Sequence, residues 1–308
     1  MQMMRSALLW ASRNTTMERV VRSSRAMRPL VSRFMPGETA DEAMSAVRAL
    51  NAEGTPSILT YLGENVNTDA AADQTVQEYE ALFAKVRESG ADVQVSIKLT
   101  QFGWDVDRKR ALDRVRAMAR LARDANTLLP IDMEGSPYVA STVDAYETLG
   151  REFDNVSLCL QAYLHRTPRD VQRLLSLPPS IRLVKGAYRE PGTVALQTRP
   201  DIDARYRALG RQLLEASKNG ARVVFGTHDL GLIAQLREDA RAVGVAESSL
   251  EVQMLYGIQD AGRRALARSG VRTRVLISYG RAWYPWFMRR LAEKPSNLLL
   301  VGRNVFGR

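Results

Sequence analysis

The sequence predicts an α/β protein: a distorted (β/α)8 TIM-like barrel with an N-terminal helical arm. Eight short apolar or β-branched runs follow one another along the chain, and segments with helical spacing and charged faces lie between them. Strands that alternate with helices in this way form parallel sheets through crossover connections. Eight such units within 308 residues match the size and strand number of a barrel. A doubly wound sheet is the alternative, but the sequence has neither G-x-G-x-x-G nor a Walker A loop.

The expected strands are four to seven residues long, which is the usual length of a strand. They are rich in Val, Ile and Leu. We expect them at Ser57–Leu62, Val93–Leu99, Leu129–Met133, Val156–Gln161, Ile181–Lys185, Arg222–Thr227, Leu250–Leu255 and Arg274–Tyr279.

Four of the connecting segments are predicted helices. The segment Thr75–Gly90 ends in glycine, which readily adopts the left-handed conformation that closes a helix. Asp107–Asn126 repeats its spacing of apolar and charged residues. Asp201–Gly220 begins with aspartate, a good N-cap, and Asp229–Val245 is the fourth helix.

Residues 1–35 are predicted to form the basic helical arm, and residues 36–308 the catalytic barrel. The first 35 residues carry seven Arg and one acidic residue, Glu18. This composition also resembles that of a transit peptide. Apolar residues such as Leu8, Val20 and Val21 give the segment an amphipathic pattern, so we favour the helical arm.

The net charge of +10 is concentrated at the two ends, since residues 262–308 carry eleven Lys or Arg and one acid. Three interpretations stay open: a solvated basic face, attraction to an anionic membrane surface, and nucleic-acid binding. We expect no nucleic-acid partner, because aromatic residues do not interleave with the basic runs in any known motif.

Cysteine and histidine are too few for several kinds of site. The single cysteine, Cys159, allows no internal disulfide and no thiolate cluster. His165 and His228 are the two histidines, which makes a His-rich metal site unexpected, so we predict no metal. No apolar run reaches the roughly 18 residues that span a bilayer.

The carboxyl ends of barrel strands form the active site in this fold, so the residues there are the candidate site. Cations outnumber carboxylates among them, which predicts an anionic ligand. A glycine-containing turn after one strand and an Arg pair on the last helix suggest two anion sites, for a phosphorylated cofactor and a small carboxylate substrate. The candidates are Lys98, Asp132, Glu134, Gln161, Arg182, Lys185, Tyr188, Thr227, His228, Asp229, Gln253, Leu255, Tyr279, Arg289 and Arg290.

Eight motifs resemble the proline dehydrogenase family in its monofunctional bacterial form. In order they are "YLGENV", "SIKLTQFG", "IDMEGSPY", "LQAYLHRT", "RLVKGAYRE", "FGTHD", "EVQMLYG" and "WYPWFMRRLAEKPSNL", and they cover roughly residues 34–297. The resemblance implies a barrel that holds FAD and oxidises L-proline to Δ1-pyrroline-5-carboxylate. It implies hydride transfer from proline C5 to flavin N5, with a membrane quinone as the electron acceptor. The chain is too short to include an aldehyde dehydrogenase module.

The resemblance also implies roles for individual residues. Arg182 matches the arginine near flavin N5, and Lys185, Gly186 and Ala187 match the turn that contacts FAD. The other residues that match FAD contacts are Met133, Gln161, Thr227 and His228. The residues that match the substrate site are Lys98, Tyr188, Leu255, Tyr279, Arg289 and Arg290. Asp132 and Arg182 are the expected catalytic residues, and the resemblance ties Asp132 to Tyr279 through the pocket wall.

Several alternatives remain at this point. Asp132 is either a proton acceptor or an electrostatic partner of Lys98, and we favour the partner because neighbouring cations make a carboxylate a poor base. Glu293, four residues after Arg289, is expected to orient that guanidinium. The chain could also be a Schiff-base aldolase through Lys185, another flavin enzyme such as a folate reductase, or a non-catalytic barrel that binds an anionic partner.

The loop Arg189–Asp203 is longer than most such connections, and we expect it to cover the cofactor. Tyr279 is expected to favour proline over 4-hydroxyproline. We expect a cytoplasmic protein with peripheral contact at the inner membrane as an option. Functional coupling to a separate pyrroline-5-carboxylate dehydrogenase is a further expectation.

Overall fold

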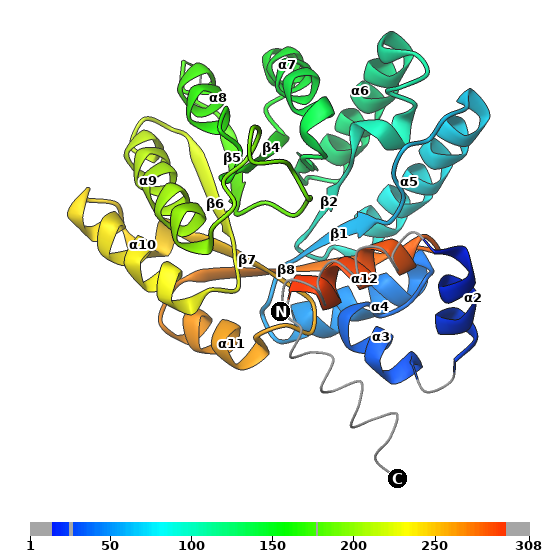
Figure 1. Ribbon diagram of the computed structural model, residues 1–308. Helices are drawn as coiled ribbons and strands as arrows, with labels where there is room; N and C mark the ends of the chain where they lie inside the picture. The colour runs from blue at the N-terminus through cyan, green and yellow to red at the C-terminus, as the bar shows by residue number, and fades with distance from the viewer. Residues whose placement is uncertain (1–13, 25–26, 177, 294–308) are drawn as a thin grey trace.

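Eight parallel strands form the centre of the computed structural model, which describes residues 14–24, 27–176 and 178–293 (Figure 1). They are β1 (Ser57–Tyr61), β2 (Val93–Ser96), β3 (Leu129–Ile131), β4 (Val156–Gln161), β5 (Ser180–Val184), β6 (Arg222–Gly226), β7 (Glu251–Leu255) and β8 (Arg272–Tyr279). Neighbours pair in the order β2-β1-β8-β7-β6-β5-β4-β3. Ile97 N donates to Pro130 O at 2.9 Å and Asp132 N to Ile97 O at 2.8 Å, which joins the β2 and β3 edges. The predicted barrel is confirmed.

Helices surround the strands in Figure 1, one after most strands. Four of them begin at a side-chain cap, because Thr68, Asp107, Thr198 and Asp229 each accept a hydrogen bond from an N–H group of the first turn. The helices are α5 (Asp69–Ser89), α6 (Arg108–Asp124), α7 (Ser136–Glu152), α8 (Thr167–Leu174), α9 (Arg199–Ser217), α10 (Leu230–Ala242) and α11 (Asp260–Arg268).

The main differences from the sequence prediction lie at element ends. α5 starts six residues before the predicted Thr75, because Thr68 caps it by accepting from Ala71 N at 3.2 Å. β2 ends at Ser96 rather than Leu99, since the chain turns into the 3-10 helix η1 (Leu99–Phe102). α8 and α11 have eight and nine residues, too few turns for a helical period to stand out in the sequence.

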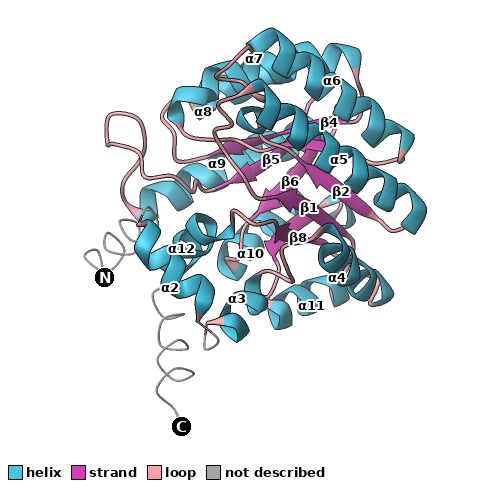
Figure 2. Ribbon diagram, turned by 90° about the vertical axis from the view of Figure 1, so that its right-hand side faces the viewer, coloured by secondary structure: helices cyan, strands magenta, loops and turns pink. Residues whose placement is uncertain are grey.

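The wall position between β8 and β1 is filled by a helix that precedes the barrel. α4 (Ala40–Ala52) packs against both of these strands. α12 (Trp283–Glu293), which follows β8, packs instead on α3 (Arg28–Phe34), and both views show the two helices close together (Figures 1 and 2). The rings of Phe34 and Phe287 lie 6.3 Å apart in this cluster. The barrel is distorted because α4 takes the wall position that α12 would otherwise occupy. This displacement brings α12 to the site described below.

The described part of the predicted arm docks on α12. Arg22 of α2 (Thr15–Ser23) lies 4.9 Å from the centre of the Trp283 ring and donates to Arg281 O at 2.5 Å. The predicted apolar contact Leu8 falls outside the described residues. Neither the arm nor any other helix of the described ranges combines the length and the apolarity that crossing a membrane requires.

Candidate active site

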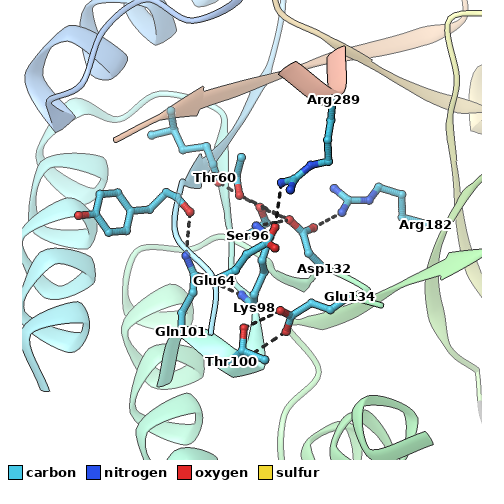
Figure 3. A network of polar contacts seen from close by, with 12 residues as sticks. Thr60, Glu64, Ser96, Lys98, Thr100, Gln101, Asp132, Glu134, Arg182 and Arg289 are labelled. Atoms are coloured by element: carbon cyan, nitrogen blue, oxygen red, sulfur yellow. Dashed lines mark hydrogen bonds and ion pairs between the residues drawn. The ribbon is translucent and has the colours of Figure 1, made fainter. Parts of the chain in front are cut away.

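A carboxylate that is only 13% exposed, Asp132, gathers polar groups from several strands of the barrel (Figure 3). Arg182 of β5 forms an ion pair with its Oδ1 through Nη2. Lys98 Nζ lies 3.5 Å from Oδ2. The hydroxyl groups of Thr60 on β1 and Ser96 on β2 each lie 3.4 Å from the same oxygen. The structure therefore brings the predicted residues Lys98, Asp132 and Arg182 together.

The two cations control the ionisation of Asp132. Burial acts to raise the pKa of Asp132, but Arg182 and Lys98 outweigh it and hold this pKa below its ordinary value. The carboxylate is therefore charged at neutral pH, and the geometry favours the electrostatic role over proton acceptance. Asp132 and Tyr279, both within the described ranges, form no hydrogen bond with each other, and the Tyr279 ring packs 5.4 Å from that of Tyr61.

A chain of buried polar groups continues from Arg182 into the barrel. Arg182 Nη1 donates to Gln253 Oε1 at 3.4 Å, and Gln253 Nε2 donates to Glu251 Oε1 at 2.9 Å. Arg274 Nε donates to the same Glu251 oxygen at 3.1 Å. Since Glu251 is an acceptor, it fixes the amide of Gln253 with its oxygen toward Arg182. Arg182 can lie within a buried strand because its guanidinium has an anionic partner on one side and a polar partner on the other.

α12 contributes Arg289 to the rim of the same site. Its Nη2 donates to Glu64 Oε1 at 3.1 Å, and its guanidinium carbon lies 6.0 Å from the ring centre of Tyr188. Tyr188 Oη lies 3.5 Å from the same Glu64 oxygen, and burial raises the pKa of Tyr188, so its hydroxyl stays a neutral donor. Arg290 is half-buried on the same helix. The side chain of Glu293, the predicted partner of Arg289, falls outside what is described.

A second buried carboxyl group, Glu134, lies beside the first. Thr100 donates to it twice, through Oγ1 at 2.5 Å and through its backbone N at 3.2 Å. Burial raises the pKa of Glu134 to about 7, although the bonds from Thr100 and the charge of Lys98 oppose the shift. Gln161 Nε2 donates to the backbone oxygen of Glu134 at 2.9 Å, and Gln161 Oε1 accepts from Ala187 N at 3.2 Å.

The predicted cofactor turn after β5 is held by acidic partners. Lys185 Nζ forms an ion pair with Asp203 and another, of 3.0 Å, with Asp229. The pKa of Asp229 falls to about 2, because hydrogen bonds from Lys185 and others outweigh its burial. Gly186 has φ +130, and a Cβ there would lie 2.3 Å from Cδ1 of Tyr163. Glycine is therefore required for the turn in both conformation and space.

The remaining predicted residues also lie at strand ends. Met133 and Thr227 are buried, and Thr227 Oγ1 accepts from the backbone N of Asp229 at 3.2 Å. His228 Nε2 accepts from the backbone N of Leu255 at 3.3 Å, so the ends of β6 and β7 are joined there. The predicted loop Arg189–Asp203 ends earlier in the structure, because α9 begins at Arg199. Glu190 anchors this loop by accepting from Ser136 N at 2.7 Å.

Sequence reasoning missed the side chains Thr60, Glu64, Ser96 and Thr100. Glu64 follows β1 by three residues, so the strand-end rule, extended to the first strand, was the signal that would have found it. Thr60, Ser96 and Thr100 carry no comparable signal, because uncharged hydroxyl residues are common inside and after strands.

Comparison with known proteins relates the whole chain to one family. The model of the family described as proline dehydrogenase matches residues 43–301. Proline dehydrogenase 1 of Bacillus subtilis (strain 168) is 32% identical over 304 residues, covering 98% of this chain and 99% of the relative. Proline dehydrogenase of Deinococcus radiodurans is 35% identical over 305 residues, or 97% of each chain. The solved structure of proline utilization A from Bdellovibrio bacteriovorus, inactivated by N-propargylglycine, has a TM-score of 0.81 at 25% identity, over 88% of this chain and 33% of that one.

Proposed function

Because this chain belongs to the proline dehydrogenase family, we propose that its barrel binds FAD and oxidises L-proline to Δ1-pyrroline-5-carboxylate. Family membership makes the chain an oxidoreductase of proline catabolism, and the proposal adds the cofactor, the reacting atoms and the electron acceptor. The observation that carries the proposal is the buried cluster of Lys98, Asp132 and Arg182, with Arg289 close by (Figure 3).

The strand ends fit a flavin nucleotide. Arg182 Nε is a buried donor that bonds to no nitrogen or oxygen acceptor among the described residues, and we assign this guanidinium to the flavin ring region. Lys185 and the positive-φ turn at Gly186 offer charge and close backbone approach. The Ala187 N–H already donates to Gln161. We therefore assign Ala187 and Gln161 to shaping the turn and the pocket for the flavin ring. Met133, Thr227 and His228 complete the proposed contacts.

Oxidation of proline to the product removes a hydride from C5 and a proton from nitrogen, which leaves a C=N bond. FAD, when bound, supplies the N5 atom that accepts the hydride. Beside a bound flavin, the positive charge of Arg182 would favour the electron-rich reduced form, and Asp132 holds that guanidinium in place. Asp132 is a weak base because its pKa is low, so the amine proton passes to solvent.

The substrate is held by its carboxylate and its ring. Arg289 and Arg290 bind the carboxylate, which matches the planar donor fork of a guanidinium. Glu64 and Tyr188 orient Arg289. Lys98 adds a further positive charge. Leu255 packs against the pyrrolidine ring, and Tyr279 closes the pocket near ring C4.

The electron acceptor in this proposal is a membrane quinone. Two features support peripheral contact with an anionic membrane: the basic ends of the chain, and α2, where Val20 is 63% and Met17 39% exposed beside the exposed Arg19. Sedimentation with anionic vesicles at low salt tests this contact, since charge attraction is strongest there. Absence of vesicle binding at low salt would refute the proposed contact with an anionic membrane.

A separate pyrroline-5-carboxylate dehydrogenase is the proposed consumer of the product. One relative, Bifunctional protein PutA of Escherichia coli (strain K12), is bifunctional by its name and much longer than this chain, which supports a second activity that acts together with that of the family. Stopped assays with both enzymes mixed would show a shorter lag in product oxidation than free diffusion allows.

The visible spectrum of the purified protein, followed by anaerobic addition of L-proline, tests the main proposal. Flavin bands that bleach with L-proline and persist with D-proline are the expected result. Bands that persist with both exclude L-proline as the substrate and redirect the search to another carboxylate or a folate. Absence of flavin bands even after FAD is added would overturn the cofactor assignment.

A further inference from the structure

The loop after β1 is attached to η1 by three hydrogen bonds. Gln101 Nε2 donates to Tyr61 O at 2.8 Å, where β1 ends. Asn65 N donates to Thr100 Oγ1 at 3.1 Å, and Val66 N donates to Thr100 O at 3.0 Å. Asn65 has φ +57, a left-handed conformation that is uncommon for a residue other than glycine. The loop backbone around Asn65 is therefore held in place by contacts from η1.

Thr100 makes the loop contact through its side-chain hydroxyl group. When Glu134 is ionised, the single hydrogen of this hydroxyl is donated to Glu134 Oε2 at 2.5 Å, which leaves the oxygen to accept from Asn65 N. Thr100 is fully buried and Glu134 is 2% exposed, so water does not substitute for either group. Glu134 thus orients the Thr100 hydroxyl, and this hydroxyl holds the backbone at Asn65 in position.

The residue before Asn65 is Glu64, the carboxylate that accepts from Arg289 (Figure 3). The contacts form one path from Glu134 through Thr100 and the loop to the guanidinium on α12. A guanidinium that is already oriented loses less freedom when it binds a carboxylate, so its affinity is higher.

We propose that Thr100 and Glu134 are positioning residues that set the affinity for the substrate carboxylate by holding Glu64 against Arg289. This inference rests on the proposed function, because it takes Arg289 as the residue that binds the carboxylate of proline. Neither residue forms a hydrogen bond or an ion pair with Asp132 or Arg182, so changing it should alter substrate binding and keep the chemical step.

The matched pair T100V and T100S tests the proposal in the flavin-loaded enzyme. T100V keeps the shape and removes the hydroxyl, and it is expected to raise KM for L-proline about tenfold with kcat within about twofold. T100S keeps the hydroxyl and is expected to restore KM. Binding of tetrahydrofuran-2-carboxylate, which lacks the amine, is followed by its perturbation of the flavin spectrum and should weaken about as much in T100V.

A double-mutant cycle separates positioning from general damage. In an E64Q background T100V should cause no further rise in KM, because the path ends at Glu64. An additive rise there overturns the proposal. The E134Q side chain has one acceptor oxygen, whereas Thr100 offers two donors, so E134Q should raise KM about threefold. This variant replaces T100V in the test if T100V does not fold.

R289K distinguishes failure of this inference from failure of the proposed function. If R289K raises KM while T100V and E134Q leave it unchanged, Arg289 binds the carboxylate and the positioning role is wrong. If R289K also leaves KM unchanged, the substrate site itself is wrongly assigned, and the inference falls with it.

Discussion

Glu134 should make the stability of the protein fall as the pH rises from about 4.5 to about 7. Its pKa is about 7 in the folded protein against 4.5 as the ordinary value. Between these values the folded state binds the proton more tightly than the unfolded state, so protonation stabilises folding and the effect is lost as the carboxyl group ionises. A shift of this size corresponds to roughly 3 kcal/mol, since one pKa unit is about 1.4 kcal/mol.

The E134Q variant removes this titration while it keeps the size of the side chain. Urea unfolding of the natural protein and of E134Q, at pH 5 and pH 8 with equal FAD, gives the free energy of unfolding of each. The difference between the two proteins should change by roughly 2 to 3 kcal/mol between the two pH values, with the natural protein favoured at pH 5. E80Q, an exposed change on α5, is the control. If the stability of E134Q runs parallel to that of the natural protein, Glu134 does not titrate as argued.

Three further predictions concern the turn after β5, the pocket wall and the buried charges. G186A should lose flavin and lower the melting temperature, because its Cβ would lie 2.3 Å from the ring of Tyr163. G192A is the control and should do neither, since a Cβ there meets its nearest neighbour at 3.6 Å. Equal flavin content in the two variants would contradict this prediction. The natural enzyme should prefer L-proline to 4-hydroxyproline by about a hundredfold in kcat/KM, and Y279A should narrow that ratio. D132N should cost about 3 to 5 kcal/mol of stability in urea unfolding, because it leaves two buried cations without their carboxylate.

The sequence was sufficient to predict the barrel and the central cluster. Alternation of strands and helices fixes the architecture, and the architecture puts every strand's carboxyl end on one rim. Lys98, Asp132 and Arg182 are far apart in the sequence and meet because each lies at or near such an end. Arg182 also lies within an apolar run of the sequence, where an arginine needs a partner.

Contacts that depend on the path of the chain were beyond the sequence. Local spacing suggested Glu293 for Arg289, whereas the described partner is Glu64, more than 200 residues away. The pairing arises because α4 fills the wall beside β8 and leaves α12 to pack on α3. Lys185 likewise finds Asp203 and Asp229 on two separate connections. Periodicity gives the face of a helix but not the place where the helix docks.

The charges around Asp132 explain why one carboxylate is kept among several cations. Without it, Arg182 and Lys98 would face each other at a buried site and each would weaken the charge of the other. With it, Arg182 stays ionised and is held through Nη2, while Gln253 holds Nη1. A guanidinium fixed on two sides presents its positive charge without reorganising, which is how a protein group best stabilises charge that develops during a reaction. The pKa of Asp132 is therefore low because this carboxylate holds the two cations Arg182 and Lys98, which stabilise its charged form.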